Sequence, residues 1–103
     1  MFLLHTEQML SDYSNIKEAQ RKAFKYLGKS AVISPSTRKD KKYMIRDQNT
    51  GRIVHFGQLG YEDFTKHKDM ERRQRYLNRA TNMRGDWRDN PYSPNNLSIN
   101  ILW

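Results

Sequence analysis

Residues 42–56 read KYMIRDQNTGRIVHF, and this stretch decides the fold of the chain. Two runs rich in β-branched and aromatic residues, 42–46 and 52–56, flank a short loop that contains Asn and Gly. This pattern predicts a β-hairpin in which Tyr43 and Ile45 share one face of the first strand. A hairpin alone is only marginally stable in water, so a third strand or a packed helix must support it.

The segment before the hairpin offers both kinds of support. Residues 16–27 carry apolar side chains at helical spacing, and Asn15 and Glu18 have the spacing of a capping box. We therefore expect a helix over 16–27. Ala, Val and Ile at 31–33 predict a short strand, which a turn-rich Ser-Pro-Ser-Thr cluster then ends.

The segment after the hairpin predicts a basic helix and an apolar end. Asp69 can cap a helix that runs from about Met70 to Met83. The apolar stripe of this helix consists of Met70, Leu77, Ala80 and Met83, with Tyr76 beside it. Arg73 interrupts the stripe where an apolar residue would be expected. Residues 97–103 alternate as a strand would, but Pro94 and the spacing that follows it also fit a short helix.

These elements together predict a small single α+β domain. It contains an N-terminal helix, a short antiparallel hairpin or three-stranded sheet, a basic helix and an apolar C-terminal segment. A chain of 103 residues is long enough for one domain with a thin core. It has no cysteine, which excludes disulfides, thiolate nucleophiles and Cys-based zinc sites. We expect no membrane span, because no apolar run in the sequence approaches the roughly 20 residues that a span needs. We also expect no secretion signal, because the apolar run at the N-terminus stops at His5.

Positive charge is the main functional signal of the composition. The chain has 19 Lys and Arg against 11 Asp and Glu, a net charge of +8. Three segments, 16–29, 38–46 and 66–84, carry net charges of +4, +4 and +5. If they share a face, they create a field that attracts anions. The candidate contacts to nucleic acid or to an acidic partner are Lys39, Lys41, Lys42, Arg72, Arg75 and Arg79, with Tyr43 and Tyr76 as candidate stacking platforms. The alternatives are a solvated basic face or a protein interface, where Arg and Tyr are also common.

No pattern in the sequence indicates catalysis. The histidines, His5, His55 and His67, lack the spacing of a metal site, and we expect structural roles for the latter two. Adjacent carboxylates at Glu62 and Asp63 favour a helix cap or an ion pair with a nearby arginine over acid–base chemistry. We therefore expect no enzyme, no cofactor and no metal.

The second half of the chain contains two specific motifs, the His-Phe-Gly step at 55–57 and the Tyr-Glu-Asp-Phe-Thr-Lys-His-Lys-Asp run at 61–69. Further segments accompany them, namely Lys41–Met44, Arg72–Leu77, Trp87, Leu97-Ser98 and Leu102-Trp103. With these motifs the chain resembles a family of small basic proteins of nucleocytoplasmic large DNA viruses. The resemblance covers residues 30–103. It implies a viral origin, and it suggests a location in the virion and, during assembly, in the host cytoplasm.

The resemblance suggests a structural role as a minor capsid protein. Such a protein would bind the inner face of the shell and link capsid proteins, with DNA as a further partner. The apolar ends are the expected interface anchors, namely Phe2, Leu3, Leu4, Met9, Leu10 and Trp103. Residues 1–13 would form an interaction arm on a domain of residues 14–103, so their deletion should leave the fold intact. The alternative is a nucleic-acid-binding virion or replication-associated protein that uses its basic helix and loop.

Overall fold

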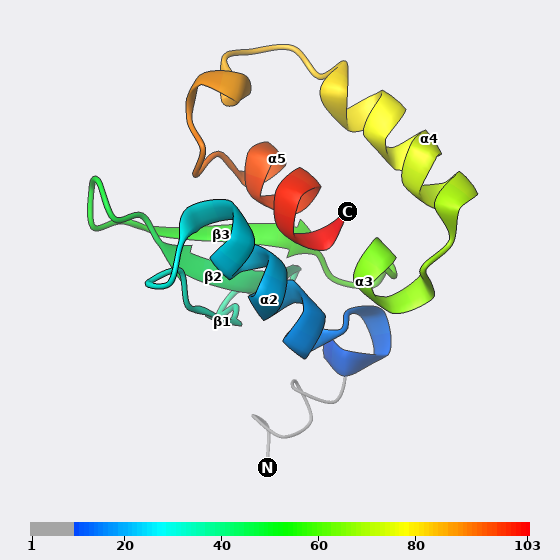
Figure 1. Cartoon of the computed structure of the whole chain (residues 1–103), viewed down its shortest axis with the longest axis horizontal. Helices are drawn as coiled ribbons and strands as arrows, with labels where there is room; N and C mark the ends of the chain where they lie inside the picture. The colour runs from blue at the N-terminus through cyan, green and yellow to red at the C-terminus, as the bar shows by residue number, and fades with distance from the viewer. Residues whose placement is uncertain (1–9) are drawn as a thin grey trace.

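The computed structural model describes residues 10–103 and forms a single α+β domain around a three-stranded antiparallel sheet (Figure 1). Its elements are α2 (Ile16–Leu27), β1 (Ile33–Pro35), β2 (Lys41–Arg46), β3 (Ile53–Gln58), α3 (Phe64–His67), α4 (Met70–Thr81) and α5 (Pro94–Leu97). A 3-10 turn at Trp87–Asp89 precedes α5, and a π-helical turn at Ser98–Leu102 continues it. Residues 10–13 are also helical. The fold class predicted from the sequence is confirmed.

The sheet is the expected hairpin extended by one strand. Its order is β1-β2-β3, which places β2 in the centre. Tyr43 on β2 lies opposite Phe56 on β3, and their ring centroids are 5.8 Å apart. Ile45 is paired with Ile33 on one side and with Val54 on the other. Tyr43 and Phe56 are completely buried, so this face of the sheet forms the floor of the core.

α2 covers that floor and has the bounds that the sequence predicts. The Asn15 side chain accepts a hydrogen bond of 3.1 Å from the backbone N–H of Glu18, which is one half of the predicted capping box. The other half does not form, because the Asn15 N–H donates to Thr65 Oγ1 at 2.9 Å and the Glu18 carboxylate binds Arg21. Ala19 and Ala23 are fully buried, and α2 packs against the C-terminal π-helical turn. The small side chains on this face allow the two segments to approach closely.

The C-terminal segment takes the helical one of its two expected conformations. Leu97, Ile101 and Leu102 are buried in the core between α2 and β3. Gly57 on β3 permits this packing, because a Cβ there would lie 2.8 Å from Leu102 Cδ1. Its φ of +82° is also a conformation that side-chain-bearing residues rarely adopt.

β1 differs from its prediction. The strand begins at Ile33 and includes Ser34 and Pro35, which were expected in a turn. Its outer edge is occupied by the amide of Gln20, which accepts a hydrogen bond from Ile33 N–H (2.9 Å) and donates one to Ala31 O (2.8 Å). Pro35 is the next residue of β1 whose backbone nitrogen faces this edge, and a proline has no N–H to donate. The edge is therefore closed to the addition of another strand.

The start of the described chain corrects the expected domain boundary. Leu10 is only 2% exposed and belongs to the core cluster. The backbone oxygen of Tyr13 accepts a hydrogen bond of 3.1 Å from Asp63 N–H. Residues 10–13 are thus part of the domain and not of an arm, and removal of residues 1–13 would remove core contacts. The expected anchors Phe2, Leu3, Leu4 and Met9 lie outside the described residues.

Candidate nucleic-acid interface

α4 begins at a well-formed cap and stands away from the body of the domain (Figure 1). The Asp69 carboxylate accepts hydrogen bonds from the backbone N–H groups of Glu71 and Arg72, at 3.0 and 3.2 Å. These bonds hold the pKa of Asp69 below its usual range. The helix ends at Thr81, two residues before the predicted end at Met83.

An aromatic stack joins α4 to the rest of the domain. The rings of Tyr76 and Trp103 lie parallel, with centroids 4.1 Å apart and an interplanar angle of 9°. Arg73 Nε donates a hydrogen bond of 2.7 Å to the backbone oxygen of Trp103, and its guanidinium lies over the ring of Phe64. Trp103 is therefore half-buried within its own domain, and its expected role as an anchor for a partner stays a prediction.

The inward face of α4 keeps the middle of the predicted apolar stripe but not its ends, because Ala80 is buried and Tyr76 and Leu77 are half-buried. Met70 and Met83, expected at its ends, are exposed by 63% and 54%. Arg73, which was predicted to interrupt the stripe, faces inward and binds Trp103. α4 is also held at its C-terminal end, where Ala80 is buried and the Asn95 side chain donates a hydrogen bond of 2.9 Å to the Ala80 oxygen. The flanks on either side of this inward face carry hollows.

One flank of α4 forms a hollow of about 400 Å³, which we call the arginine groove. The residues that define it are Arg72, Arg75 and Arg79 of α4, with Tyr61, Gln58 and Glu62 on the opposite side. The spacing of three and four residues places the three arginines on one face of the helix, along about 10 Å of its axis. The Tyr61 side chain is 69% exposed at the rim.

The charge of the arginine groove is nearly uncompensated. Glu62 lies 3.9 Å from Arg72, and both side chains are about 40% exposed, a geometry that contributes little. No carboxylate within residues 10–103 lies within 4.0 Å of Arg75 or Arg79. The groove can thus bind an anionic group without first breaking a strong ion pair.

The structure brings together three of the six predicted contact residues. Arg72, Arg75 and Arg79 line the groove, whereas the three lysines lie elsewhere or serve another role. Lys41 is half-buried at the start of β2, opposite Gln58, and Lys39 is exposed in the preceding turn. Lys42 is only 3% exposed and forms an ion pair of 3.0 Å with Asp63, so its assignment as a surface contact is wrong. Tyr43 is buried and Tyr76 is stacked on Trp103, so neither is a free platform for a base.

Lys42 and Asp63 belong to a buried polar network that ties three segments together. Asp63 caps α3 by accepting a hydrogen bond from Thr65 N–H (3.0 Å), and Thr65 Oγ1 lies 3.2 Å from Ser14 Oγ. The Tyr43 hydroxyl donates to the same serine at 2.7 Å. Burial lowers the pKa of Lys42, and the adjacent Asp63 charge opposes that shift. The acidic pair of the sequence therefore serves as a cap and as ion-pair partners, as expected.

The two histidines of the described chain make local contacts. His55 Nδ1 lies 2.7 Å from Ser36 Oγ. His67 Nδ1 accepts a hydrogen bond from Asp69 N–H (2.9 Å), and its ring packs between Phe64 and Trp103. In the part of the chain that the structure covers, no three His, Cys, Asp or Glu side chains form a group that could hold a metal ion.

Sequence reasoning missed Tyr61 and the second flank of α4. Tyr61 lies in a segment without clear periodicity, and only its place between a glycine and two carboxylates marked it as a loop residue. The other flank is lined by lysines of α2, which were counted as charge but not placed near α4. No local signal links residues so far apart in the chain.

Part of the chain is similar to a known protein family. Residues 31–80 match a family of unknown function (DUF5754). Neither the curated proteins nor the solved structures contain a match to the chain. The matched segment spans the sheet, the Lys42–Asp63 ion pair and most of α4, including the three arginines of the groove. Among the helices of residues 10–103, none has the length and apolarity needed to span a bilayer.

Proposed function

We propose that the domain binds nucleic acid and holds its phosphate backbone in the arginine groove. The observation that carries this proposal is the position of Arg75 and Arg79, which line a hollow without a carboxylate partner beside the exposed ring of Tyr61. Guanidinium groups match the geometry and charge of phosphate oxygens. An exposed tyrosine at the rim offers a surface on which a base can stack.

The geometry favours binding that tolerates many nucleotide sequences. Arginines that contact phosphates fix position but carry no sequence information. The logarithm of the binding constant should therefore fall linearly with the logarithm of the salt concentration, with a slope of about −0.9 for each phosphate neutralised on duplex DNA. The resemblance to proteins of large DNA viruses suggests that this binding takes place in a virion or during replication.

Fluorescence anisotropy with a labelled duplex tests the proposal. The variant R75A/R79A should weaken binding about tenfold or more and reduce the salt slope by roughly two. The matched control is R46A/R52A, which removes the same charge from exposed positions at the far end of the β2–β3 hairpin (Figure 1). An equal loss in both variants would show that only net charge matters and would contradict the groove.

A structural role in the capsid is a second proposal, favoured by a different surface. An apolar hollow of about 460 Å³ lies between α2 and β1 and is lined by the half-exposed Ile16 and Phe24. Lys17 and Arg21 also line it, which suits an acidic protein partner. Because the edge of β1 is closed, such a partner would dock with side chains and not as an added strand.

Binding to purified shell protein at low and high salt tests this role. Binding through the apolar hollow should persist at high salt and should be lost in the variant F24D. The control V32D places the same charge on a more exposed apolar residue that does not line the hollow. Equal binding by F24D and V32D would refute the docking surface.

A further inference from the structure

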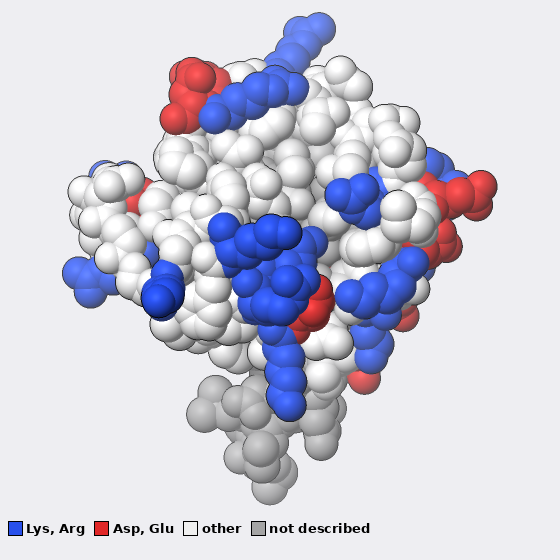
Figure 2. Space-filling view, in the orientation of Figure 1, with Lys and Arg blue, Asp and Glu red and all other residues white. Residues whose placement is uncertain are grey.

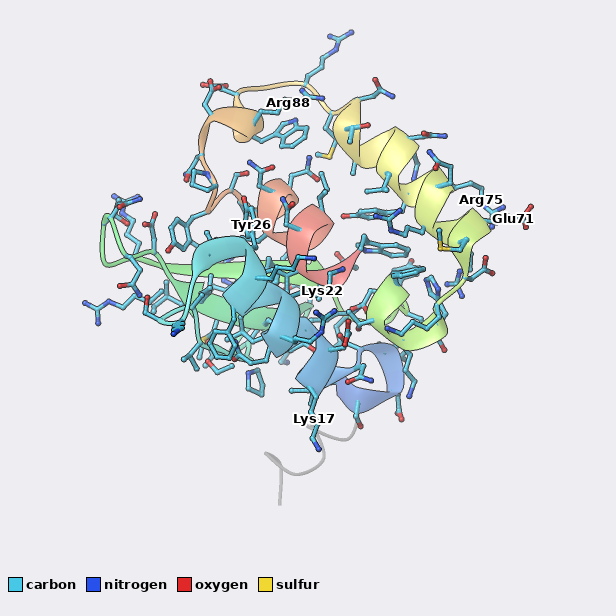
Figure 3. The ribbon with its side chains drawn as sticks, viewed as in Figure 1. Lys17, Lys22, Tyr26, Glu71, Arg75 and Arg88 are labelled. Atoms are coloured by element: carbon cyan, nitrogen blue, oxygen red, sulfur yellow. The ribbon has the colours of Figure 1, made fainter. Side chains whose placement is uncertain are left out.

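A second basic cluster lies on the other flank of α4. Two adjoining hollows there, of about 260 and 650 Å³, are both lined by Lys22 of α2, Arg73 of α4 and Trp103. Lys25 lines the larger of the two. We call Lys22, Lys25 and Arg73 the α2–α4 cluster. Figure 2 shows Lys and Arg side chains gathered over α2 at the centre of this face, and Figure 3 shows Lys22 between α2 and the C-terminal turn.

The two lysines of the α2–α4 cluster have no ion-pair partner within the described chain. Glu18 of α2 lines the smaller hollow, but it is engaged by Arg21, whose Nε donates to it at 3.2 Å. No Asp or Glu side chain of residues 10–103 lies within 4.0 Å of Lys22 or Lys25. Arg73 is already engaged, because its Nε donates a hydrogen bond of 2.7 Å to the Trp103 backbone oxygen and its guanidinium lies over the ring of Phe64. Partial burial and the nearby Arg73 charge lower the pKa of Lys22, so the two cations repel each other across the hollow. An anion bound between them would relieve that repulsion.

The α2–α4 cluster and the arginine groove lie on different sides of one helix. At about 100° per residue, the groove residues Arg72, Arg75 and Arg79 point roughly 150° away from Arg73 and Leu77, which line the cluster side. The Tyr76–Trp103 stack stands between the arginine groove and the α2–α4 cluster. Trp103 lines the groove on one side and the larger hollow of the cluster on the other. A single anionic segment in one hollow therefore does not fill the other.

We propose that the α2–α4 cluster is a second phosphate-binding site and that one molecule bridges two nucleic-acid segments, one on each flank of α4. This inference rests on the proposed nucleic-acid binding and adds the architecture of the complex. Each site offers two cations without a carboxylate partner in a hollow beside an aromatic ring, Arg75 and Arg79 in the groove and Lys22 and Lys25 in the cluster. The Tyr76–Trp103 stack keeps the two sites apart. The domain then acts as a crosslink that brings two segments together at the width of one helix.

A bridging assay tests this inference. One duplex, about two helical turns long, is fixed to beads, and a second, fluorescent duplex is captured only if a protein molecule holds both. Wild-type protein should retain the fluorescent duplex. The variant K22Q/K25Q should lose bridging about tenfold while its affinity for a single duplex, measured by anisotropy, falls much less. The single variant K25E, at an exposed position, should show the same loss if K22Q/K25Q does not fold.

The matched control is K17Q/K29Q, which removes equal charge from exposed positions on or next to α2, outside both hollows of the cluster. Three outcomes overturn bridging through the cluster. They are single-duplex binding without capture, equal loss of capture in the control, and capture that survives in K22Q/K25Q, which would mean that two protein copies associate. If wild-type protein binds no duplex at all, the proposed function itself is wrong.

Discussion

Lys42 and Asp63 form an ion pair in the interior, where both side chains are almost completely removed from water. Asp63 also accepts hydrogen bonds from the backbone N–H and the hydroxyl of Thr65. The carboxylate is therefore well satisfied, and Lys42 supplies its only cationic partner among the described residues. Such a pair contributes little compared with an apolar pair of the same shape, but removing one member leaves a buried charge unpaired.

The first prediction follows from that asymmetry. K42M should lower the free energy of unfolding by about 3–5 kcal/mol, because the Asp63 carboxylate would remain buried without its partner. The double variant K42M/D63N should recover a large part of this loss, since both charges are then gone. Urea denaturation of the two single variants and the double variant measures the coupling. Additive losses would show that the two side chains act independently.

His67 provides the second prediction at the residue scale. Burial and the nearby Arg72 charge lower its pKa, and its Nδ1 accepts the hydrogen bond from Asp69 N–H at the start of α4. Protonation would turn that acceptor into a donor facing another donor. The unfolded chain takes up this proton near pH 6.5, before the folded chain does, so the stabilisation is complete above that pH and is lost as the pH falls below it.

The variant H67N isolates this effect, because the Asn side-chain oxygen can accept the same hydrogen bond but does not titrate. Between about pH 7.5 and pH 5, wild-type protein should lose more free energy of unfolding than H67N. Denaturant unfolding at the two pH values provides the measurement. An identical pH dependence in both proteins would assign the loss to other groups.

At the scale of elements, the attachment of α4 depends on Trp103. W103A removes the stack on Tyr76 and the packing against His67, and it should lower the stability by about 2 kcal/mol or more. Hydrogen exchange should show the loss first in the amides of α4, while those of β2 stay protected. W103F retains an aromatic ring and should behave closer to wild type. A uniform loss across helix and sheet would mean that α4 is not a separate unit.

The elements that the sequence predicts well are those whose signals are local. Asn15, Glu18 and the spacing of two buried alanines lie within α2 itself, and the loop of the β2–β3 hairpin is contiguous with its strands. The helical form of residues 94–102 depends instead on Gly57 and α2, which lie far away in the chain. α3, with four residues, is too short to display a period.

The candidate site shows the same division. Three arginines at helical spacing were predicted together because the helix that carries them is evident from its own residues. Lys42 was misplaced because its partner, Asp63, lies 21 residues away. Arg73 appeared to break an apolar stripe, but it fits inward because its backbone partner at Trp103 lies 30 residues later. Charge counts locate cations along the chain, whereas their neighbours decide which of them remain free.

At the scale of the whole molecule, the core includes residues ahead of α2. A chain that begins at Leu10 keeps the buried Leu10 side chain and the Tyr13 contacts, whereas one that begins at Ser14 loses both. The shorter chain should be less stable by about 3 kcal/mol or more, and the loss of a buried leucine accounts for much of this. Thermal unfolding of the two truncated proteins measures the difference. Equal midpoints would restore the domain boundary expected at residue 14.

The net charge of +8 gives the last prediction. Like charges on a compact body repel each other, so added salt should raise the melting temperature by screening alone. Inorganic phosphate should raise it further than chloride at the same ionic strength, because a ligand that binds only the folded state stabilises it by mass action. Phosphate also strengthens apolar burial in any protein, so the excess over chloride has to be compared between variants.

Four double variants each remove two positive charges, namely R46A/R52A, K17Q/K29Q, R75A/R79A and K22Q/K25Q. The general stabilising effect of phosphate on apolar burial should therefore be the same in all four. If the flanks of α4 are anion sites, the first two should keep the phosphate excess, and each of the last two should lose part of it. A protein that combines R75A/R79A with K22Q/K25Q should lose the phosphate excess completely, because the arginine groove and the α2–α4 cluster bind anions independently. An excess that is the same in all variants would mean that phosphate acts on the protein as a whole and that neither flank is a site.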